Sequence, residues 1–283
     1  MGWTIRSILS WSKPYLQSKG IDSPRLDAEL LLAHALGIKR IDLYLDMDRP
    51  LTDDDLGSYR QYLKRRSCKE PVAYILGEKE FYSRTFHVNS HVLIPRPESE
   101  LLVEQAISLV PAGEKILEVG VGSGAVIVSI LAEREDLEGV GCDVNIETIG
   151  IAKNNALLHG VSSRIQFFVG DGLNPLRGQF PLIIMNPPYI ALSHADQLQD
   201  DVLKYEPHSA LFGGNDGLDI IKDIIMNVRK HLRRKGRFIM ETGYGQKEAI
   251  DDLIRSAQGI RTQAWIKDLS GTYRVVIVEN SDG

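Results

Sequence analysis

The feature that most limits the folds open to this chain is a regular alternation of strand-like and helix-like segments that begins near residue 115. Short apolar runs rich in Val, Ile and Phe alternate with longer segments of helical periodicity. The expected strands are residues 115–120, 139–144, 164–170, 182–186 and 237–241, and the expected helices are residues 98–109, 123–135, 145–160 and 218–232. This order is typical of an α/β fold in which helices cover both faces of a mostly parallel sheet.

The segment that precedes this alternation has a different pattern. Residues 1–80 contain no strand-like alternation of apolar and polar side chains. Ser23 followed by Pro24 is a typical helix start, and so is Thr52, which is followed by three aspartates that favour the positive end of a helix dipole. These signals predict a small all-α domain.

Two further pairs of extended segments are expected. Residues 81–88 and 91–95 are strand-like and end at the rigid Pro95-Arg96-Pro97. Residues 265–269 and 273–279 flank the turn residues Ser270-Gly271 and predict an antiparallel pair at the C-terminal edge of the sheet. The predicted division of the chain is a helical domain at 1–80, a β-hairpin linker at 81–97 and an α/β domain at 98–283.

Composition limits the compartment and the partners. The chain has 283 residues, a net charge of −5 and two isolated cysteines, Cys68 and Cys142, so neither a disulfide framework nor a zinc site is expected. The seven histidines show no metal-ligand spacing. No apolar run approaches the ~20 residues that span a bilayer, and the N-terminus lacks the apolar core of a signal peptide. We expect a soluble cytoplasmic protein with no bound metal and no membrane partner.

A glycine-rich loop follows the first strand of the predicted sheet, with the sequence Glu118-Val119-Gly120-Val121-Gly122-Ser123-Gly124-Ala125. Glycines let the backbone turn sharply and approach a ligand at the exposed N-terminus of the next helix. The second strand ends at Asp143, an acid placed to bind a ribose hydroxyl, and the third ends at Gly170-Asp171-Gly172. Because the carboxyl ends of neighbouring strands share one crevice, we expect a nucleotide-type cofactor there. The alternative to a cofactor site is a tight turn that serves only packing, with the acidic residues acting as helix caps.

The glycine pattern alone leaves the identity of the cofactor open. Gly120-x-Gly122-x-x-Ala125 also fits the dinucleotide fingerprint, with Asp143 at a plausible distance. Glu118, however, puts a carboxylate directly beneath the loop, which suits the cationic amino group of a methionyl moiety better than a pyrophosphate. The antiparallel C-terminal edge is also atypical of the dinucleotide fold. Both details favour S-adenosylmethionine.

The tetrad Asn186-Pro187-Pro188-Tyr189 ends the fourth expected strand and therefore lies on the rim of the same crevice. A planar –NH₂ group is hard to methylate because its lone pair is delocalised. Two acceptors aimed at its N–H bonds, the side-chain oxygen of Asn186 and the carbonyl of Pro187, would hold the nitrogen for attack on a methyl group. Tyr189 offers a flat face for stacking. The alternative is a simple proline turn after a strand.

These motifs together resemble those of class I S-adenosylmethionine-dependent methyltransferases that act on planar nitrogens, a group that includes DNA adenine-N6 and protein glutamine-N5 enzymes. The tetrad does not separate these two. Several other segments do so, because they closely resemble those of release-factor glutamine methyltransferases; they are residues 71–77, 80–81, 92–100 and 214–219, together with the helical N-terminal domain. The resemblance covers nearly the whole chain and implies a Rossmann-like methyltransferase sheet preceded by a small all-α domain.

The resemblance also implies roles for individual residues. The residues implied to bind S-adenosylmethionine, which leaves as S-adenosylhomocysteine, are Glu118, Val119, Gly120, Val121, Gly122, Gly124, Asp143, Asp171, Gly172 and Asn186. The residues implied to hold the substrate glutamine are Asn186, Pro187, Pro188 and Tyr189, and the catalytic ones among them are Asn186, Pro187 and Tyr189. By the same resemblance, that glutamine belongs to the Gly-Gly-Gln loop of peptide chain release factors. In this family the helical domain helps to bind the release factor.

The chain departs from the family pattern at a few positions. Members often have Thr at the positions of Val121 and Ser123, usually have Thr at Ser99, and often have Trp where this chain has Gly172. The last difference affects the packing against the adenine and not the chemistry of transfer.

Three other functions compete with this one. A DNA adenine methyltransferase would need basic residues to grip the backbone, but residues 1–80 carry 13 basic and 12 acidic side chains. A non-catalytic partner-binding protein would not need an intact tetrad. A nicotinamide dehydrogenase would be shown by the fluorescence of the reduced cofactor on binding. We therefore expect a protein substrate, no direct contact with nucleic acid, and a monomer, because the substrate is itself a large protein.

Overall fold

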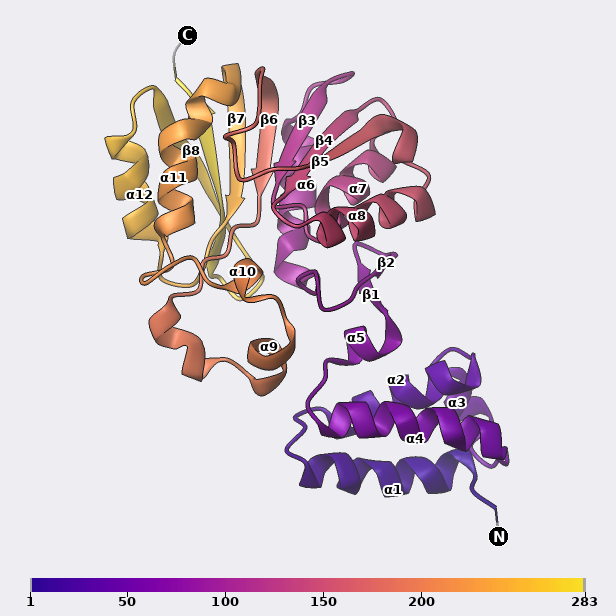
Figure 1. Ribbon diagram of the computed structural model, residues 1–283. Coiled ribbons are helices and arrows are strands. Elements are labelled where there is room, and N and C mark those ends of the chain that lie inside the picture. The colour runs from indigo at the N-terminus through magenta and orange to yellow at the C-terminus, as the bar shows by residue number, and fades with distance from the viewer. Residues whose placement is uncertain (1, 282–283) are drawn as a thin grey trace. The chain divides into compact units, whose positions relative to one another are not determined.

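The computed structural model describes residues 2–281 (Figure 1). The chain forms two compact units. One contains the residues up to Glu78 together with Gln199–Tyr205, and the other contains Lys79–Leu198 and the residues from Glu206 onward. Within residues 2–281, no helix combines the length and the apolar character that crossing a membrane requires.

The first unit is built from helices around one apolar core. Its helices are α1 (Ile5–Ser18), α2 (Pro24–Leu36), α3 (Asp42–Leu45), α4 (Asp53–Ser67) and α5 (Val72–Leu76), joined by α9 (Asp200–Tyr205) from later in the chain. Leu16, Leu31 and Tyr59 are fully buried where α1, α2 and α4 pack together. Apolar residues at helical spacing on each of the three helices supply this core.

The two predicted helix starts differ in how they are capped. Thr52 and Asp55 form a reciprocal capping box, in which the Asp55 amide donates to Thr52 Oγ1 at 3.1 Å and the Thr52 amide donates to Asp55 Oδ2 at 2.9 Å. Helix α2 begins at Pro24 as predicted, but the Ser23 side chain makes no capping hydrogen bond.

This difference makes a matched pair of predictions. Thr52→Ala is expected to lower the free energy of unfolding of the helical unit by about 1 kcal/mol, because the Asp55 amide loses its side-chain acceptor. Ser23→Ala is expected to change it by less than about 0.5 kcal/mol. Chemical denaturation followed by circular dichroism measures both values. Equal losses in the two variants would contradict the assignment of the cap to Thr52.

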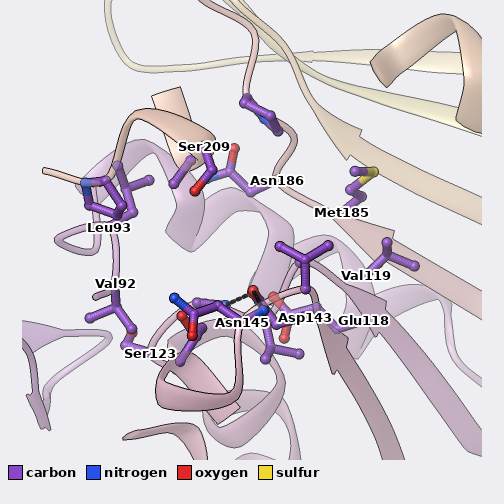
Figure 2. A pocket seen from close by; sticks show the side chains of 18 of the residues that line it. Val92, Leu93, Glu118, Val119, Ser123, Asp143, Asn145, Met185, Asn186 and Ser209 are labelled. Carbon is purple, nitrogen blue, oxygen red and sulfur yellow. Dashed lines mark hydrogen bonds between the residues drawn. The ribbon is translucent and has the colours of Figure 1, made fainter. Parts of the chain in front are cut away.

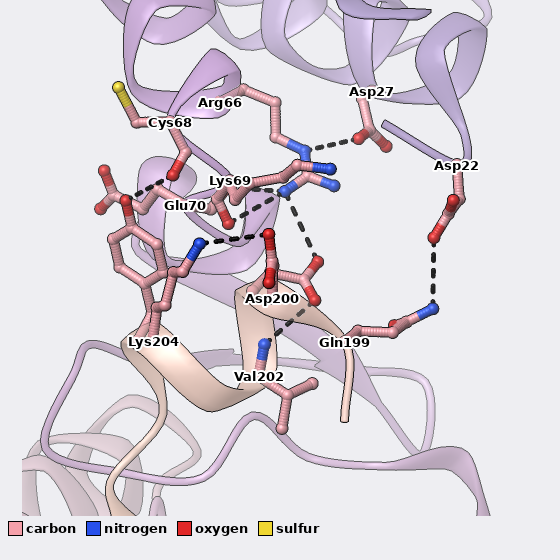
Figure 3. A network of polar contacts seen from close by, with 12 residues as sticks. Asp22, Asp27, Arg66, Cys68, Lys69, Glu70, Gln199, Asp200, Val202 and Lys204 are labelled. Carbon is pink, nitrogen blue, oxygen red and sulfur yellow. Dashed lines mark hydrogen bonds and ion pairs between the residues drawn. The ribbon is translucent and has the colours of Figure 1, made fainter. Parts of the chain in front are cut away.

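Helix α9 joins the helical unit although it lies more than 120 residues downstream. Arg66 is buried and donates to Asp27 Oδ2 at 2.7 Å, and its Nη1 lies 3.5 Å from Asp201 Oδ2 on α9 (Figure 3). Gln199 Nε2 donates to Asp22 Oδ2 at 3.2 Å. These charged and polar contacts hold residues 199–205 in the unit, so the chain leaves the second unit after Leu198 and returns to it at Glu206.

The second unit is built on a seven-stranded sheet of order β5-β4-β3-β6-β7-β9-β8. Its strands are β3 (Lys115–Val119), β4 (Glu138–Asp143), β5 (Ile165–Val169), β6 (Phe180–Met185), β7 (Leu232–Glu241), β8 (Ile260–Lys267) and β9 (Tyr273–Asn280). Its α-helices are α6 (Glu100–Leu109), α7 (Ala125–Glu133), α8 (Ile146–Leu158), α10 (His208–Leu211), α11 (Asp219–Asn227) and α12 (Lys247–Ser256). Its short 3₁₀ helices are η1 (Pro97–Ser99), η2 (Ser162–Arg164), η3 (Leu192–Gln197) and η4 (Val228–His231).

Helices cover both faces of this sheet (Figure 1). Along β6, Leu182 and Ile184 pack with α6 and α7, whereas Ile183 and Met185 pack with α11 and α12. Successive side chains of a strand point to opposite faces, so a strand that is apolar throughout must be covered on both. Strands β3 to β7 pair in parallel, and β9 pairs antiparallel with both β7 and β8. The predicted fold class, a mostly parallel sheet with an antiparallel C-terminal edge and a helical N-terminal region, is confirmed.

The connection order creates a crevice. The chain runs from β3 outward to β4 and β5 and then returns to β6 on the other side of β3. The loops that leave β3 and β6 therefore diverge, which is where α/β sheets of this kind bind ligands. The glycine loop follows β3, Asp143 ends β4, and Asn186 follows β6, so all three lie at this edge.

The segment between the two units differs from the prediction. The hairpin consists of β1 (Glu78–Phe81) and β2 (Arg84–His87), so it begins three residues earlier than expected. Tyr82 and Ser83 form its two-residue turn, with positive φ values of 49° and 57°. The prediction of a second extended strand at 91–95 is wrong. Residues 88–96 form no strand, and Pro95 lacks the backbone donor that a strand would use.

Smaller differences occur along the sheet. Strands β7 and β8 each begin five residues before the predicted segments, and α12 was not predicted. The helix expected at 218–232 ends as α11 at Asn227 and continues as the 3₁₀ helix η4. The turn at Ser270-Gly271 is as predicted, with the Gly271 amide donating to Asp268 O at 3.0 Å.

Candidate active site

A cavity of about 560 Å³ opens at the carboxyl ends of β3, β4 and β6. In Figure 2, Asn186 and Ser209 lie on one side of it, and Asp143 and Asn145 lie on the other. The residues predicted for the site that line this cavity are Glu118, Val119, Gly120, Val121, Gly122, Asp143, Asp171, Gly172, Asn186 and Pro188. The fold thus brings the glycine loop, the strand-end acids and the tetrad to one cavity.

The glycine loop presents bare backbone to the cavity. Gly120 and Gly122 have φ values of +72° and +52°, which side-chain-bearing residues rarely adopt, and a Cβ on either would meet no atom within 4 Å. The amides of Gly120 and Val121 both donate to Cys142 O, at 2.9 and 3.0 Å, which anchors the loop on β4. The open space beside the glycines is therefore available to a ligand.

Gly124 has a different role from its two neighbours. It lies outside the cavity lining and caps the N-terminus of α7 with φ +80°. A Cβ there would come within 3.3 Å of the Ala152 Cβ on α8. This glycine permits the close approach of two helices, and it does not line the cavity with the other two glycines.

Glu118 is a buried carboxylate beneath the loop. It is 2% exposed, and its Oε2 accepts a hydrogen bond from the Ile127 amide at 3.0 Å. Burial raises the pKa of Glu118 well above its usual range, and the nearby charge of Asp143 adds to this effect. No cationic group of the described chain pairs with Glu118, so a cation in the cavity would stabilise its charged form.

Asp143 is held by the loop itself. Its Oδ2 accepts from the Gly122 amide at 3.1 Å, and its Oδ1 accepts from the Asn145 amide at 3.2 Å. Burial nevertheless raises the pKa of Asp143. Next to the cavity, a Cβ on Gly172 would make an ordinary van der Waals contact with Ile224 Cδ1, at 3.6 Å.

The tetrad follows β6 without interruption and is fixed by neighbouring loops. The Ile190 amide donates to Leu211 O, and the Gly213 amide donates to Ile190 O, both at 3.0 Å. Asn186 and Pro188 line the cavity, whereas Pro187 is buried and Tyr189 lies outside the lining. The structure therefore places the side chains of only two tetrad residues on the cavity wall.

A buried polar network connects the tetrad to two other elements. Asn186 Nδ2 donates to Ser99 Oγ at 3.0 Å, and Ser99 Oγ donates to Glu241 Oε2 at 2.5 Å. Tyr189 OH donates to Glu241 Oε1 at 3.2 Å. Burial raises the pKa of Glu241, and burial together with the charge of Glu241 raises the pKa of Tyr189. Tyr189 therefore acts as a hydrogen-bond donor at neutral pH.

The sequence did not indicate that Ser99 and Glu241 make hydrogen bonds to the tetrad. Ser99 was noted only as a mild departure from the family pattern. Glu241 ends β7 directly after the buried apolar residues 238–240, and a carboxylate at the carboxyl end of such a run is a signal that could have identified it. A third missed acid, Glu206, is also buried and accepts hydrogen bonds from the Ile94 amide at 3.1 Å and from Arg96 Nη2 at 2.5 Å.

These contacts form a second wall of the cavity. Arg96 and the segment that follows Glu206 both border the cavity, and the lining residues of that segment are Pro207, Ser209, Ala210 and Phe212. Because Glu206 is the first residue after the chain returns from the helical unit, its two hydrogen bonds fix where this wall begins.

Comparison with known proteins first defines the class. Residues 97–206 match the family model "Methyltransferase small domain", and residues 7–77 match "PrmC N-terminal domain". A solved structure of a methyltransferase from Pyrococcus furiosus has a similar fold, with a TM-score of 0.53 and 17% identity, covering 72% of this chain and 91% of that one. The fold is that of the methyltransferases.

Curated relatives then define the family. The chain is 38% identical to a release factor glutamine methyltransferase from Geobacter sulfurreducens, over 97% of this chain and 96% of that protein. It is 35% identical to one from Caulobacter vibrioides, with the same coverage of both chains. The chain belongs to the release factor glutamine methyltransferase family.

Proposed function

We propose that this protein transfers a methyl group from S-adenosylmethionine to the side-chain amide nitrogen of the glutamine in the Gly-Gly-Gln loop of peptide chain release factors. The observation that carries the proposal is that Asn186, the first residue of the tetrad, lines the same cavity as the glycine loop and its acids. An acceptor for an amide and the features of a nucleotide-cofactor site thus share one cavity.

The cavity fits the cofactor in size and in chemistry. Its volume is within the range of about 300–1,000 Å³ found for small-molecule sites. Bare backbone at Gly120 and Gly122 leaves room for close approach, and Asp143 offers a carboxylate for a ribose hydroxyl. Glu118 would compensate the charge of the methionyl ammonium group. When bound, S-adenosylmethionine supplies an electrophilic methyl group on a sulfonium.

The tetrad would prepare the amide nitrogen for transfer. Asn186 Oδ1 and Pro187 O would each accept one hydrogen bond from the –NH₂ group of the glutamine amide. These two hydrogen bonds would hold the nitrogen toward the methyl group. Held there, the glutamine nitrogen would take the methyl group that the cofactor supplies and would release one proton to water. Rate enhancement comes chiefly from positioning, because no side chain has to act as a strong base.

The helical unit is proposed to recognise the release factor. Its sequence has nearly balanced charge, with 13 basic and 12 acidic residues in 1–80, which suits a protein partner better than a nucleic acid. We infer that the enzyme acts as a cytoplasmic monomer on this protein substrate.

The test is a transfer assay with methyl-labelled cofactor. Purified release factor, the same factor with its Gly-Gly-Gln glutamine changed to alanine, and duplex DNA are offered in parallel, and the labelled product is located by mass spectrometry. We expect label only on the glutamine of the unmodified factor. Label on DNA adenine, or on the glutamine-free factor, would overturn the proposal.

The role proposed for Glu118 predicts a pH-dependent affinity. A cationic ligand favours the ionised carboxylate, so the affinity for S-adenosylmethionine is expected to rise with pH through the raised pKa of Glu118. Glu118→Gln should remove this dependence and weaken binding about tenfold or more at neutral pH. Calorimetric titration at a series of pH values measures both effects, with exposed Glu135→Gln as the control.

Stability without ligand should change in the opposite direction. Because the folded-state pKa of Glu118 is raised, the folded protein retains a proton that the unfolded chain has already lost, and stability falls as pH rises through this range. Glu118→Gln removes this penalty and is expected to raise the melting temperature at neutral pH. A lower melting temperature together with unchanged cofactor affinity would contradict the assigned role.

A further inference from the structure

We propose that Ser99 and Glu241 are positioning residues that fix the orientation of the Asn186 amide, so that its Oδ1, and not its Nδ2, faces the substrate. This inference rests on the proposed function, because it assigns the orientation that the acceptor role of Asn186 requires. It concerns two residues that do not themselves hold the reacting nitrogen.

The direction of each hydrogen bond follows from the buried carboxylate. An ionised carboxylate only accepts, and the two oxygens of Glu241 accept from Ser99 Oγ and from Tyr189 OH. A serine hydroxyl has a single hydrogen, and Ser99 donates it to Glu241. Toward Asn186, therefore, Ser99 can only accept, and only the Nδ2 side of the amide can donate to it.

The opposite end of the amide is left free. Among residues 2–281, no hydrogen bond engages Asn186 Oδ1, and Asn186 lines the cavity. An asparagine amide can rotate by half a turn with little change in shape, so its orientation is set by the hydrogen bonds around it. If the Asn186 amide were reversed, its –NH₂ would confront the –NH₂ of a glutamine, donor against donor, and no hydrogen bond could form.

Rigid elements hold this arrangement. Met185 of β6 is paired in register with Met240 of β7, so Asn186 and Glu241 follow as the next residues on adjacent parallel strands. Ser99 ends η1, directly before α6, and is 4% exposed, while Glu241 is 1% exposed. Ser99 borders the cavity, whereas Glu241 lies outside the cavity lining, so a carboxylate buried in the protein sets the direction of these hydrogen bonds.

Three substitutions test the direction of these hydrogen bonds. Ser99→Ala removes the anchor and is expected to lower kcat about 10- to 100-fold, with cofactor affinity unchanged within about twofold. Ser99→Thr keeps the hydroxyl and should restore most of the lost rate. Glu241→Gln should lower kcat further than Ser99→Ala does. In the orientation that keeps the hydrogen bond from Tyr189 OH to the remaining carbonyl oxygen, its new –NH₂ donates to Ser99, whose hydrogen then turns to Asn186 Oδ1 and reverses the amide.

The control is Ser129→Ala. Ser129 is also a fully buried serine, but its hydroxyl has no hydrogen-bond partner and it lies on α7, outside the network. This variant is expected to keep the wild-type kcat and cofactor affinity. Thermal melts of all variants separate loss of positioning from loss of the fold.

A second measurement does not depend on turnover. The Asn186 side-chain amide signal in NMR, assigned by its disappearance in Asn186→Asp, should exchange slowly with water in the wild type and in Ser99→Thr, and rapidly in Ser99→Ala and Glu241→Gln. Slow exchange in all four proteins, or kcat within twofold of wild type in Ser99→Ala and Glu241→Gln, would overturn the inference. If the wild type transfers no methyl group to a release factor, the proposed function fails, and the exchange pattern still decides the orientation.

Discussion

Replacement of Asn186 by alanine is expected to reduce methyl transfer by at least about 100- to 1,000-fold, which is the range seen when one preorganised polar contact to a reacting group is lost. Asn186 Oδ1 is the only tetrad side-chain atom proposed to accept from the substrate amide, and the variant leaves the glycine loop and Asp143 unchanged. Cofactor affinity should therefore stay within about threefold of wild type. Single-turnover assays give the rate of transfer, and calorimetry gives the affinity.

The control for this variant is Asn227→Ala. Asn227 ends α11 and makes only local contacts, including a hydrogen bond from its Nδ2 to Asp223 O at 2.9 Å. Transfer and cofactor binding should both be preserved in it. Retained turnover in Asn186→Ala would refute the acceptor role. A parallel loss of cofactor affinity would instead assign Asn186 chiefly to cofactor binding.

The sheet was predictable from sequence because its central strands are buried on both faces. Such strands must be apolar along their whole length, and residues 182–185 show this without any knowledge of tertiary contacts. The glycine loop, Asp143 and the tetrad were predictable for a related reason. Each directly follows or ends a strand, and parallel topology brings the carboxyl ends of strands to one edge.

The contacts that complete the site were not predictable in this way. Ser99 lies 142 residues from its partner Glu241 and 87 from Asn186. Local periodicity contains no information on which distant side chains meet. The return of residues 199–205 to the helical unit was missed for the same reason, since its contacts join Arg66 to Asp201 across more than 130 residues.

Sequence also could not separate the glycines that line the cavity from the glycine that packs against the protein. Gly120, Gly122 and Gly124 are equivalent in a motif, yet only the first two have open space where a Cβ would be. The distinction depends on Ala152, which reaches Gly124 from the next helix. The sequence therefore predicted the glycine loop, but it did not predict which of the three glycines would pack against another helix.

Gly217→Ala is expected to disable the tetrad through its backbone. Gly217 has φ +79°, and a Cβ there would lie 2.3 Å from Tyr189 O, a backbone atom that cannot turn aside. Gln246 Nε2 donates to this same oxygen at 3.0 Å and to Gly217 O at 3.4 Å, so the three segments are packed against one another. We expect a loss of at least about 2 kcal/mol in stability and a more than tenfold fall in methyl transfer.

The matched control is a glycine-to-alanine substitution that is expected to raise stability instead of lowering it. Gly150 lies exposed in the interior of α8 without a positive φ, and a Cβ added to it would meet no atom within 4 Å. Gly150→Ala should therefore raise stability by about 0.5–1 kcal/mol and leave transfer unchanged. Thermal unfolding and the transfer assay measure both variants. If Gly217→Ala kept wild-type transfer, the backbone of Tyr189 could move without consequence, and the tetrad could not act by holding the glutamine amide in a fixed place.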